Sequence, residues 1–187
     1  MSNKMMSVGL AAFLGLFAAG ARAAQTGAER AIAGWNDSNK HAAQVMIEKY
    51  GQPDAYSADW LQWSNRGSFK RIVVDGRPDA PGIVAHTVSY EVPSKAIGLL
   101  SLKDSYVVPN RDAGELTAFS AGEERNVLAL NAADKVMRGR LDVDQAREFQ
   151  ERTSNLLSSG KSSPASEKLQ FRPGVDPLFN YVYTTQD

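Results

Sequence analysis

The stretch DSNKHAAQVMIEKYGQPDAYSADWLQWSNRGSFKRIVV, residues 37–74, decides the fold class. Its first part predicts a helix over about residues 39–50, because apolar side chains recur there at helical spacing. Gly51 stands where a left-handed closing residue is favoured, and Pro53 prevents the helix from continuing. The helix is therefore expected to end sharply, just before the chain changes to a different pattern.

The second part of this stretch predicts a β-hairpin with strands over about 59–64 and 69–74. The sequence Asn65-Arg66-Gly67 between them is typical of a tight turn. Because successive side chains of a strand point to opposite faces, Trp60 and Trp63 are expected on opposite faces of the sheet. Leu61 and Trp63 are therefore predicted to share one face of the hairpin, with Trp60 on the other.

The remaining chain predicts further strands and two long helices. The strands are expected over about 83–92, 105–108 and 115–119, a short helix over 94–102, and long helices over 123–138 and from 142 onward. Strands and long helices do not alternate strictly, which disfavours a doubly wound parallel sheet. We expect an α+β fold with an antiparallel sheet of about five strands and helices packed on one face, in a single domain.

The N-terminus resembles a cleavable signal peptide. Lys4 precedes an apolar run from Val8 to Ala19, which is shorter than the roughly 20 residues that cross a bilayer. Small residues at Ala21 and Ala23 fit a cleavage site after Ala23. We therefore expect residues 1–23 to be removed and the protein to be periplasmic or secreted, with no transmembrane span in the mature chain. The alternative is a buried N-terminal helix.

Composition shifts divide the mature chain into four further segments. They are a loose lead-in over 24–36, the α+β domain over 37–157, a Ser-rich flexible linker over 158–168, and an aromatic C-terminal tail over 169–187. In the tail, Phe179, Tyr181 and Tyr183 are two residues apart, so a strand would display all three on one face. Such a strand could dock on the domain or pair with the sheet edge of another protein; otherwise the tail stays free.

The charge balance and the lack of cysteine exclude several classes of protein. The chain has 21 basic and 21 acidic residues, and loss of Lys4 and Arg22 with the signal peptide leaves a net charge of −2. Nucleic-acid-binding domains are usually strongly basic, so we expect no nucleic-acid partner. Because there is no cysteine, disulfides, thiolate metal sites, cysteine nucleophiles and a lipid anchor on cysteine are not expected.

Several short motifs resemble an uncharacterised family of exported proteins from Gram-negative bacteria. The motifs are Lys49-Tyr50-Gly51-Gln52-Pro53-Asp54, Leu61-Gln62-Trp63, Phe69-Lys70-Arg71-Ile72-Val73-Val74, Leu128-Ala129-Leu130-Asn131 and Asp144-Gln145-Ala146-Arg147. The resemblance covers roughly residues 37–155. It implies an exported protein and the extent of the domain, and it implies no activity.

The two histidines offer few catalytic combinations. His86 shares a face with apolar residues in the strand over 83–92, where a histidine could act as a general base. A semi-buried structural role is the competing interpretation, and His41 is expected on the solvated flank of the first helix. No serine lies in a Gly-x-Ser-x-Gly turn that would mark a nucleophile. A small hydrolase or isomerase with a site around His86 is therefore the alternative function.

No pattern predicts a metal or a cofactor. The sequence has neither a His-Glu-x-x-His helix nor a calcium loop, and no glycine-rich phosphate loop with its Lys and Ser or Thr. Paired carboxylates cannot be chosen among 21 acidic residues without a structure. We therefore expect neither metal nor cofactor.

The first hairpin combines basic and aromatic residues in a way that is typical of binding surfaces. The candidate binding residues are Trp60, Trp63, Arg66, Lys70 and Arg71. Arg and Trp are enriched in binding hot spots, although a solvated hairpin with a core tryptophan would show the same composition. The leading hypothesis is a non-enzymatic binding or envelope-interaction module whose partner is an envelope protein or an anionic envelope component.

Overall fold

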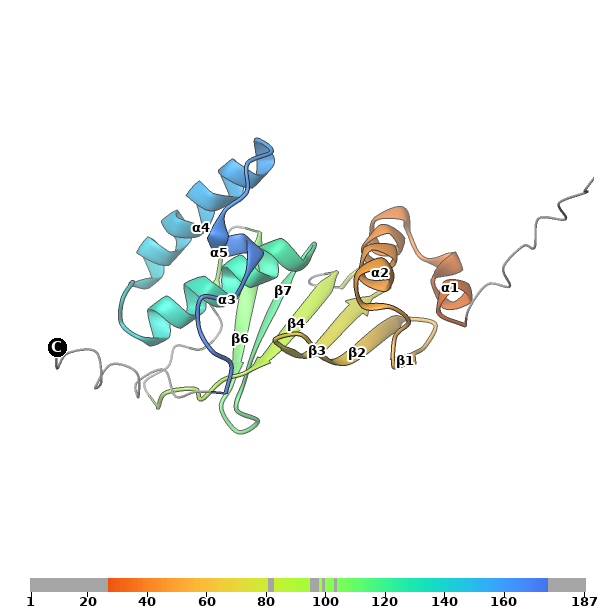
Figure 1. Ribbon diagram of the computed structural model, residues 1–187, viewed down its shortest axis with the longest axis horizontal. Helices are drawn as coiled ribbons and strands as arrows, with labels where there is room; N and C mark the ends of the chain where they lie inside the picture. Colours follow the sequence, from red (N-terminus) through yellow and green to blue (C-terminus); the bar gives the residue numbers. More distant parts are fainter. Residues whose placement is uncertain (1–26, 81–82, 95–97, 99, 103, 175–187) are drawn as a thin grey trace, which may run out of the picture.

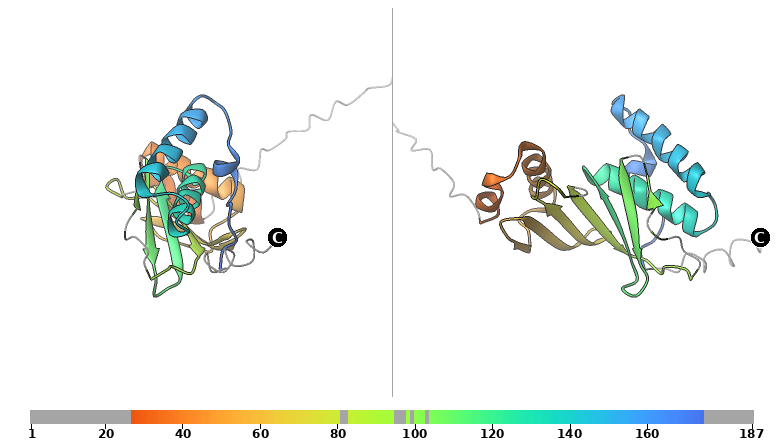
Figure 2. Two further views of the ribbon diagram at one scale, coloured as in Figure 1. Left: turned by 90° about the vertical axis from the view of Figure 1, so that its left-hand side faces the viewer. Right: turned by 180° about the vertical axis from the view of Figure 1, so that it is seen from behind.

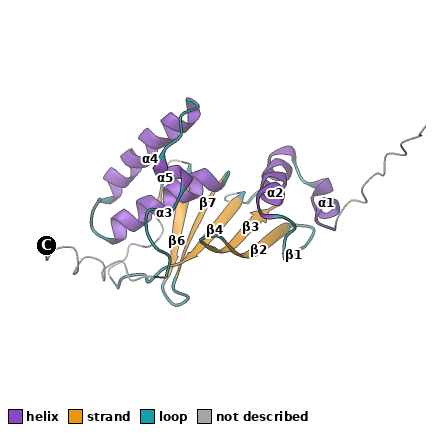
Figure 3. Ribbon diagram, viewed as in Figure 1, coloured by secondary structure: helices purple, strands orange, loops and turns teal. Residues whose placement is uncertain are grey.

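The computed structural model describes residues 27–174, except for 81–82, 95–97, 99 and 103. The helices are α1 (Gly27–Ala31), a 3₁₀ turn (Ile32–Gly34), α2 (Asp37–Tyr50), α3 (Glu123–Met137), α4 (Val143–Ser158) and α5 (Pro164–Glu167). The strands are β1 (Ala55–Tyr56), β2 (Trp60–Arg66), β3 (Phe69–Asp75), β4 (Val84–Ser89), β5 (Leu100–Ser101), β6 (Ser105–Asn110) and β7 (Glu115–Ser120). Figures 1 and 3 show this arrangement.

The strands form one antiparallel sheet in the order β1-β2-β3-β4-β7-β6-β5. The α+β class and the antiparallel sheet are confirmed, but the described residues contain seven strands, more than the five expected. The two missed strands, β1 and β5, are only two residues long and show no alternation. The helix predicted over 94–102 is wrong at its end, because Leu100 and Ser101 pair with β6.

The long helices gather on one side of the sheet (Figures 1 and 2). Helix α2 contacts β2 and β3, whereas α3 contacts β4, β6 and β7. Helix α4 packs against α3 and reaches β6 through a 2.6 Å hydrogen bond from Gln150 to Ser105. The two halves of the sheet thus each have their own covering helix, and both helices lie on the same face.

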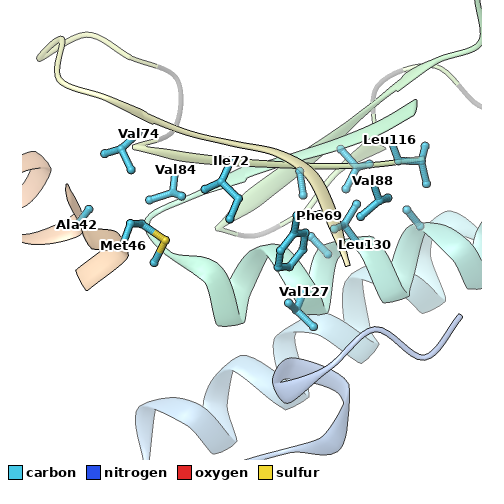
Figure 4. Packing of buried hydrophobic residues seen from close by; sticks show 14 of the residues in the cluster. Ala42, Met46, Phe69, Ile72, Val74, Val84, Val88, Leu116, Val127 and Leu130 are labelled. Atoms are coloured by element: carbon cyan, nitrogen blue, oxygen red, sulfur yellow. The ribbon is translucent and has the colours of Figure 1, made fainter. Parts of the chain in front are cut away.

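The core lies between the sheet and these two helices. Ala42 and Met46 of α2 and Leu130 of α3 are buried and lie toward the strands in Figure 4, and Val127 of α3 is buried as well. Trp63 is fully buried on the helix-facing side of β2. Burying apolar area of this kind stabilises the fold by about 25 cal/mol per Å², so the packing positions both helices firmly on the sheet.

The segment predicted as a loose lead-in is packed from Gly27 onward. Ala28, Ile32 and Trp35 are buried, and the indole nitrogen of Trp35 donates a 2.6 Å hydrogen bond to the carbonyl of Ala58. Residues 1–26 lie outside the described residues, so the signal peptide stays a prediction. Among the described helices, none is long and apolar enough to span a membrane.

The flexible linker predicted over 158–168 is wrong in its second half. Pro164–Glu167 forms α5, and Ala165 and Ser166 are buried against α3. The side-chain amide of Asn131 in α3 donates to the carbonyls of Ala165 at 2.7 Å and Lys168 at 2.9 Å. A serine-rich composition therefore conceals a packed segment. The tail aromatics Phe179, Tyr181 and Tyr183 lie outside the described residues.

Candidate functional site

The two tryptophans predicted to bind a partner lie on opposite faces of β2. Trp63 is 0% exposed, and its indole nitrogen donates a 2.9 Å hydrogen bond to the carbonyl of Gly51. Trp60, at the start of the same strand, is 37% exposed. Trp63 is therefore part of the core and cannot contact a partner of the folded protein, which corrects its assignment to the binding surface.

The basic residues of the hairpin are paired with carboxylates. Arg66 lies 2.6 Å from Asp54, and Lys70 and Arg71 lie 2.8 and 3.2 Å from the two oxygens of Glu115. The hydrogen bond from Lys70 holds the pKa of Glu115 below its ordinary value, and Arg71 adds to this effect. Three cations thus face two carboxylates, and most of the positive charge predicted for this hairpin is neutralised.

His86 is fully buried on the helix-facing side of β4. The ring of Phe69 meets it edge-on at 4.5 Å between centroids. The amide nitrogen of Asn126 lies 2.9 Å from His86 Nδ1 and 2.8 Å from the carbonyl of Val84. This arrangement makes Nδ1 an acceptor, so we assign the neutral ring a proton on Nε2. Burial lowers the pKa of His86 and keeps the ring neutral.

Glu123, the first residue of α3, connects α2, α3 and β4. Its Oε2 accepts a 2.7 Å hydrogen bond from the Tyr50 hydroxyl, and its Oε1 accepts a 3.1 Å bond from Lys49 Nζ. His86 Nε2 lies 3.6 Å from Oε2, too far for a hydrogen bond but close enough for its N–H dipole to act. Burial alone would raise the pKa of Glu123, but His86, Tyr50 and Lys49 outweigh it and lower the pKa to about 2.

Glu123 lies at an open groove between α2 and the beginning of α3. The groove has a volume of about 550 Å³, and its floor is formed by Ile83 and Val84. One wall is a single face of α2, and the other is the chain that enters α3. The walls consist of Ser38, His41, Ala42, Val45, Met46, Lys49, Ala121, Gly122, Glu123, Glu124 and Arg125. We call this site the α2–α3 groove.

We found no family model, curated protein or solved structure that matches this chain. The resemblance to an exported Gram-negative family therefore stays a prediction. Within the described residues, no group of three or more histidine, aspartate or glutamate side chains could hold a metal ion.

The groove can bind more readily than it can catalyse proton transfer. His86 does not line the groove, because it is fully buried in contact with Phe69 and Asn126. Glu123 does line it, but a carboxyl with a pKa of about 2 is far from the pH at which a general acid or base is efficient. What the site provides is an apolar surface beside one fixed negative charge.

Glu123 was not among the residues selected from the sequence. Acidic residues are common in the first turn of a helix because they complement its dipole, so the position of Glu123 in α3 does not mark a site. It is separated from Tyr50 by 73 positions in the chain, so no local pattern could join them. The other histidine, His41, is exposed on α2 as expected, and it lines the groove.

Proposed function

We propose that this protein is an exported binding module that holds a segment of a partner protein in the α2–α3 groove. The observation that carries the proposal is the combination of an apolar floor with a fixed, largely buried carboxylate in a groove of about 550 Å³. Ligand sites typically have this size, with mainly apolar walls and few well-placed polar groups. Export rests on the signal-peptide pattern of residues 1–23, and the module comprises one α+β domain.

The groove exposes apolar surface that folding alone does not require. Val45, in the middle of the α2 wall, is 40% exposed, and few other large apolar side chains in the described residues are as open. It lies between Ala42 and Met46, which are buried. A partner that covered Val45 would remove this surface from water and gain free energy in proportion to the area buried.

The hairpin predicted from the sequence supports a binding function less well than the groove. Its three cations are held by Asp54 and Glu115, and Trp63 is in the core. An anionic envelope component would have to compete with these carboxylates for the same cations. Of the two tryptophans, Trp60 is the accessible one.

The alternative of a small hydrolase or isomerase around His86 has weaker support. A general base must reach the proton that it removes, directly or through one water. His86 is fully buried and its Nδ1 is occupied by Asn126, whereas the groove contains Glu123 instead. The contact between His86 and Glu123 is better explained as a means of fixing the carboxylate.

A pair of substitutions tests the groove. We expect Val45→Arg to abolish binding of apolar peptides, because it places a cation and extra volume in the α2 wall. Leu156→Arg is the matched control, because Leu156 is 41% exposed on α4 and does not line the groove. Methyl NMR spectra of Met46 and Ile83, which both variants retain, report the binding while acetylated and amidated leucine-rich peptides are added. Equal binding by both variants would refute the proposed site.

The export part of the proposal has its own test. N-terminal sequencing of the protein recovered from the periplasm or medium is expected to begin at Ala24. Recovery of the protein in the cytoplasm with Met1 retained would contradict export and leave the groove proposal intact.

A further inference from the structure

We propose that the segment bound in the α2–α3 groove carries a lysine between apolar residues, and that its ammonium group replaces Lys49 on Glu123. This inference rests on the proposed function and adds the chemistry of the ligand. It rests on a difference between the two oxygens of the Glu123 carboxylate: their hydrogen-bond partners differ in how exposed they are to solvent.

The two oxygens are held by groups of very different accessibility. Oε2 accepts from the hydroxyl of Tyr50, which is half-buried, and faces the fully buried ring of His86. The partner of Oε1 within the described residues is the ammonium group of Lys49. The side chain of Glu123 is 14% exposed, whereas that of Lys49 is 54% exposed. Oε2 is therefore held by the partly buried Tyr50. Oε1 is held by the exposed Lys49 side chain, which can turn into solvent without exposing the core.

The carboxylate stays ionised whether or not Lys49 is bound to it. His86 and Tyr50 remain in place when the Lys49 side chain turns toward solvent, and a buried carboxylate without a cation costs free energy. A ligand ammonium can take the same position on Oε1 and restore the charge-assisted hydrogen bond. Lys49 then regains side-chain entropy and full hydration in the solvent.

The groove is lined by two cations and two carboxylates, so its charge favours a cationic ligand only once Lys49 is displaced. The charged residues at the groove are Lys49, Arg125, Glu123 and Glu124, and His41 is the remaining titratable side chain. When a ligand displaces Lys49, two carboxylates and one guanidinium remain at the groove, which then has a net negative charge. An acidic ligand would meet Arg125, but it would also be repelled by Glu123, which is fixed in position.

A protein segment fits this groove better than a free alkylamine. Small-molecule sites usually enclose most of the ligand surface, whereas the α2–α3 groove is partly open to solvent. A segment of a partner protein needs to bury only one face. Apolar residues on either side of its lysine would cover the exposed Val45 and the partly exposed Ile83.

The experiment compares three peptides on the full mature protein. Their sequence is acetyl-Leu-Leu-X-Leu-Leu-amide, in which X is lysine, norleucine or glutamate, and binding is measured by calorimetry and by methyl NMR. We expect the lysine peptide to bind several-fold more tightly than the norleucine peptide, because the exchange conserves the charge-assisted hydrogen bond on Glu123 and releases the Lys49 side chain into solvent. The glutamate peptide should bind most weakly. Hexylamine is tested in parallel and is expected to bind far more weakly than the lysine peptide.

Two substitutions separate this ligand role from a purely structural ion pair. Lys49→Met removes the competing ammonium, so it should tighten binding of the lysine peptide several-fold and leave the norleucine peptide unchanged. Lys40→Met, on the same helix but outside the groove, is the control and should change neither affinity. Glu123→Gln should abolish the preference for lysine. If that variant does not fold, Lys49→Met alone decides the question.

The outcomes distinguish this inference from the proposed function. Norleucine or glutamate peptides that bind as tightly as the lysine peptide, or weaker lysine-peptide binding by Lys49→Met, would overturn the lysine inference. Hexylamine that binds as tightly as the lysine peptide would overturn the assignment to a protein segment. If no peptide shifts the resonances of Val45 and Met46, the groove itself is refuted as the binding site, and the lysine inference fails with it.

Discussion

The indole of Trp63 in β2 donates its N–H to the carbonyl of Gly51, the residue that ends helix α2, over 2.9 Å. Gly51 has a φ of 77°, in the left-handed region that favours glycine at the end of a helix. The last carbonyls of a helix have no partner within the helix. Trp63 satisfies one of them from the sheet, and so it fixes α2, one wall of the α2–α3 groove, to the strand beneath it.

Replacing Trp63 tests this connection. Trp63→Phe keeps an aromatic ring but removes the donor and some volume, so the free energy of unfolding should fall by about 1–3 kcal/mol. Urea denaturation followed by circular dichroism measures the loss. Trp60→Phe on the exposed face is the control and should change stability by less than about 0.5 kcal/mol. Equal losses at both positions would contradict the special role of Trp63.

Burial of neutral His86 predicts that acid destabilises the protein. Because burial lowers the pKa of His86 in the folded state, the unfolded chain binds a proton first. The free energy of unfolding should therefore fall as the pH drops below about 6.5, the ordinary value for histidine. Urea denaturation between about pH 7 and pH 5 measures this slope. His86→Asn should flatten it and His41→Asn should not; the reverse result would contradict the interpretation.

The lowered pKa of Glu123 predicts a second loss of stability at lower pH. Its pKa falls from 4.5 to about 2 on folding, so its contribution is complete above pH 4.5 and disappears as the pH approaches 2. A shift of this size corresponds to about 3 kcal/mol. Glu123→Gln should remove this part of the acid unfolding curve. Glu124→Gln, at the next and more exposed position, should leave it in place; a curve altered equally by both would contradict the assignment.

Gly76 is required because it lies against the ring of Trp35. A Cβ atom at position 76 would overlap Cε2 and the neighbouring ring atoms of Trp35. Gly76→Ala should push the indole outward, lower the free energy of unfolding by about 1–3 kcal/mol and shift tryptophan fluorescence to the red. Gly34→Ala is the control, because nothing lies within 4 Å of a Cβ atom there. An unchanged spectrum for Gly76→Ala would show that the contact is not maintained in solution.

Asn131 holds the segment after α4 against α3. Besides donating to the carbonyls of Ala165 and Lys168, it accepts a 2.7 Å hydrogen bond from the backbone N–H of Gln170. Asn131→Ala should cost about 1–3 kcal/mol and expose Lys168 to trypsin. Limited proteolysis measures the cleavage, and the exposed Asn155→Ala is its control. Equal resistance of both variants to trypsin would contradict this role.

The elements that the sequence predicts well are those with local signals at both ends. Gly51 and Pro53 mark the end of α2, and Asn65-Arg66-Gly67 marks the turn between β2 and β3, so both elements agree with the structure within a few residues. Strands β1 and β5 contain two residues each and leave no periodic pattern. They exist because longer neighbouring strands offer them partners, which is information that local sequence does not contain.

The candidate site depends even more on contacts between distant residues, which local sequence does not reveal. The alternation in β2 correctly predicts that Trp60 and Trp63 face opposite ways, but it does not say which of them is buried, so the assignment of Trp63 to the binding surface is wrong. The neutralisation of Lys70 and Arg71 by Glu115 could not be predicted, because Glu115 reaches them across the sheet from β7. Likewise, the carboxylate of Glu123 gains its importance from residues of α2 and β4 that are distant in the chain.

The shortness of β1 and β5 affects how copies of this protein behave when crowded. A long unpaired strand at the rim of a sheet offers backbone groups on which another chain can polymerise. Here both rims end in strands of two residues, and the neighbouring strand β6 carries Pro109, which has no N–H to offer. The sheet therefore gives little template for fibril growth. Such protection would matter most if the chain refolds after crossing a membrane, as the proposed export requires.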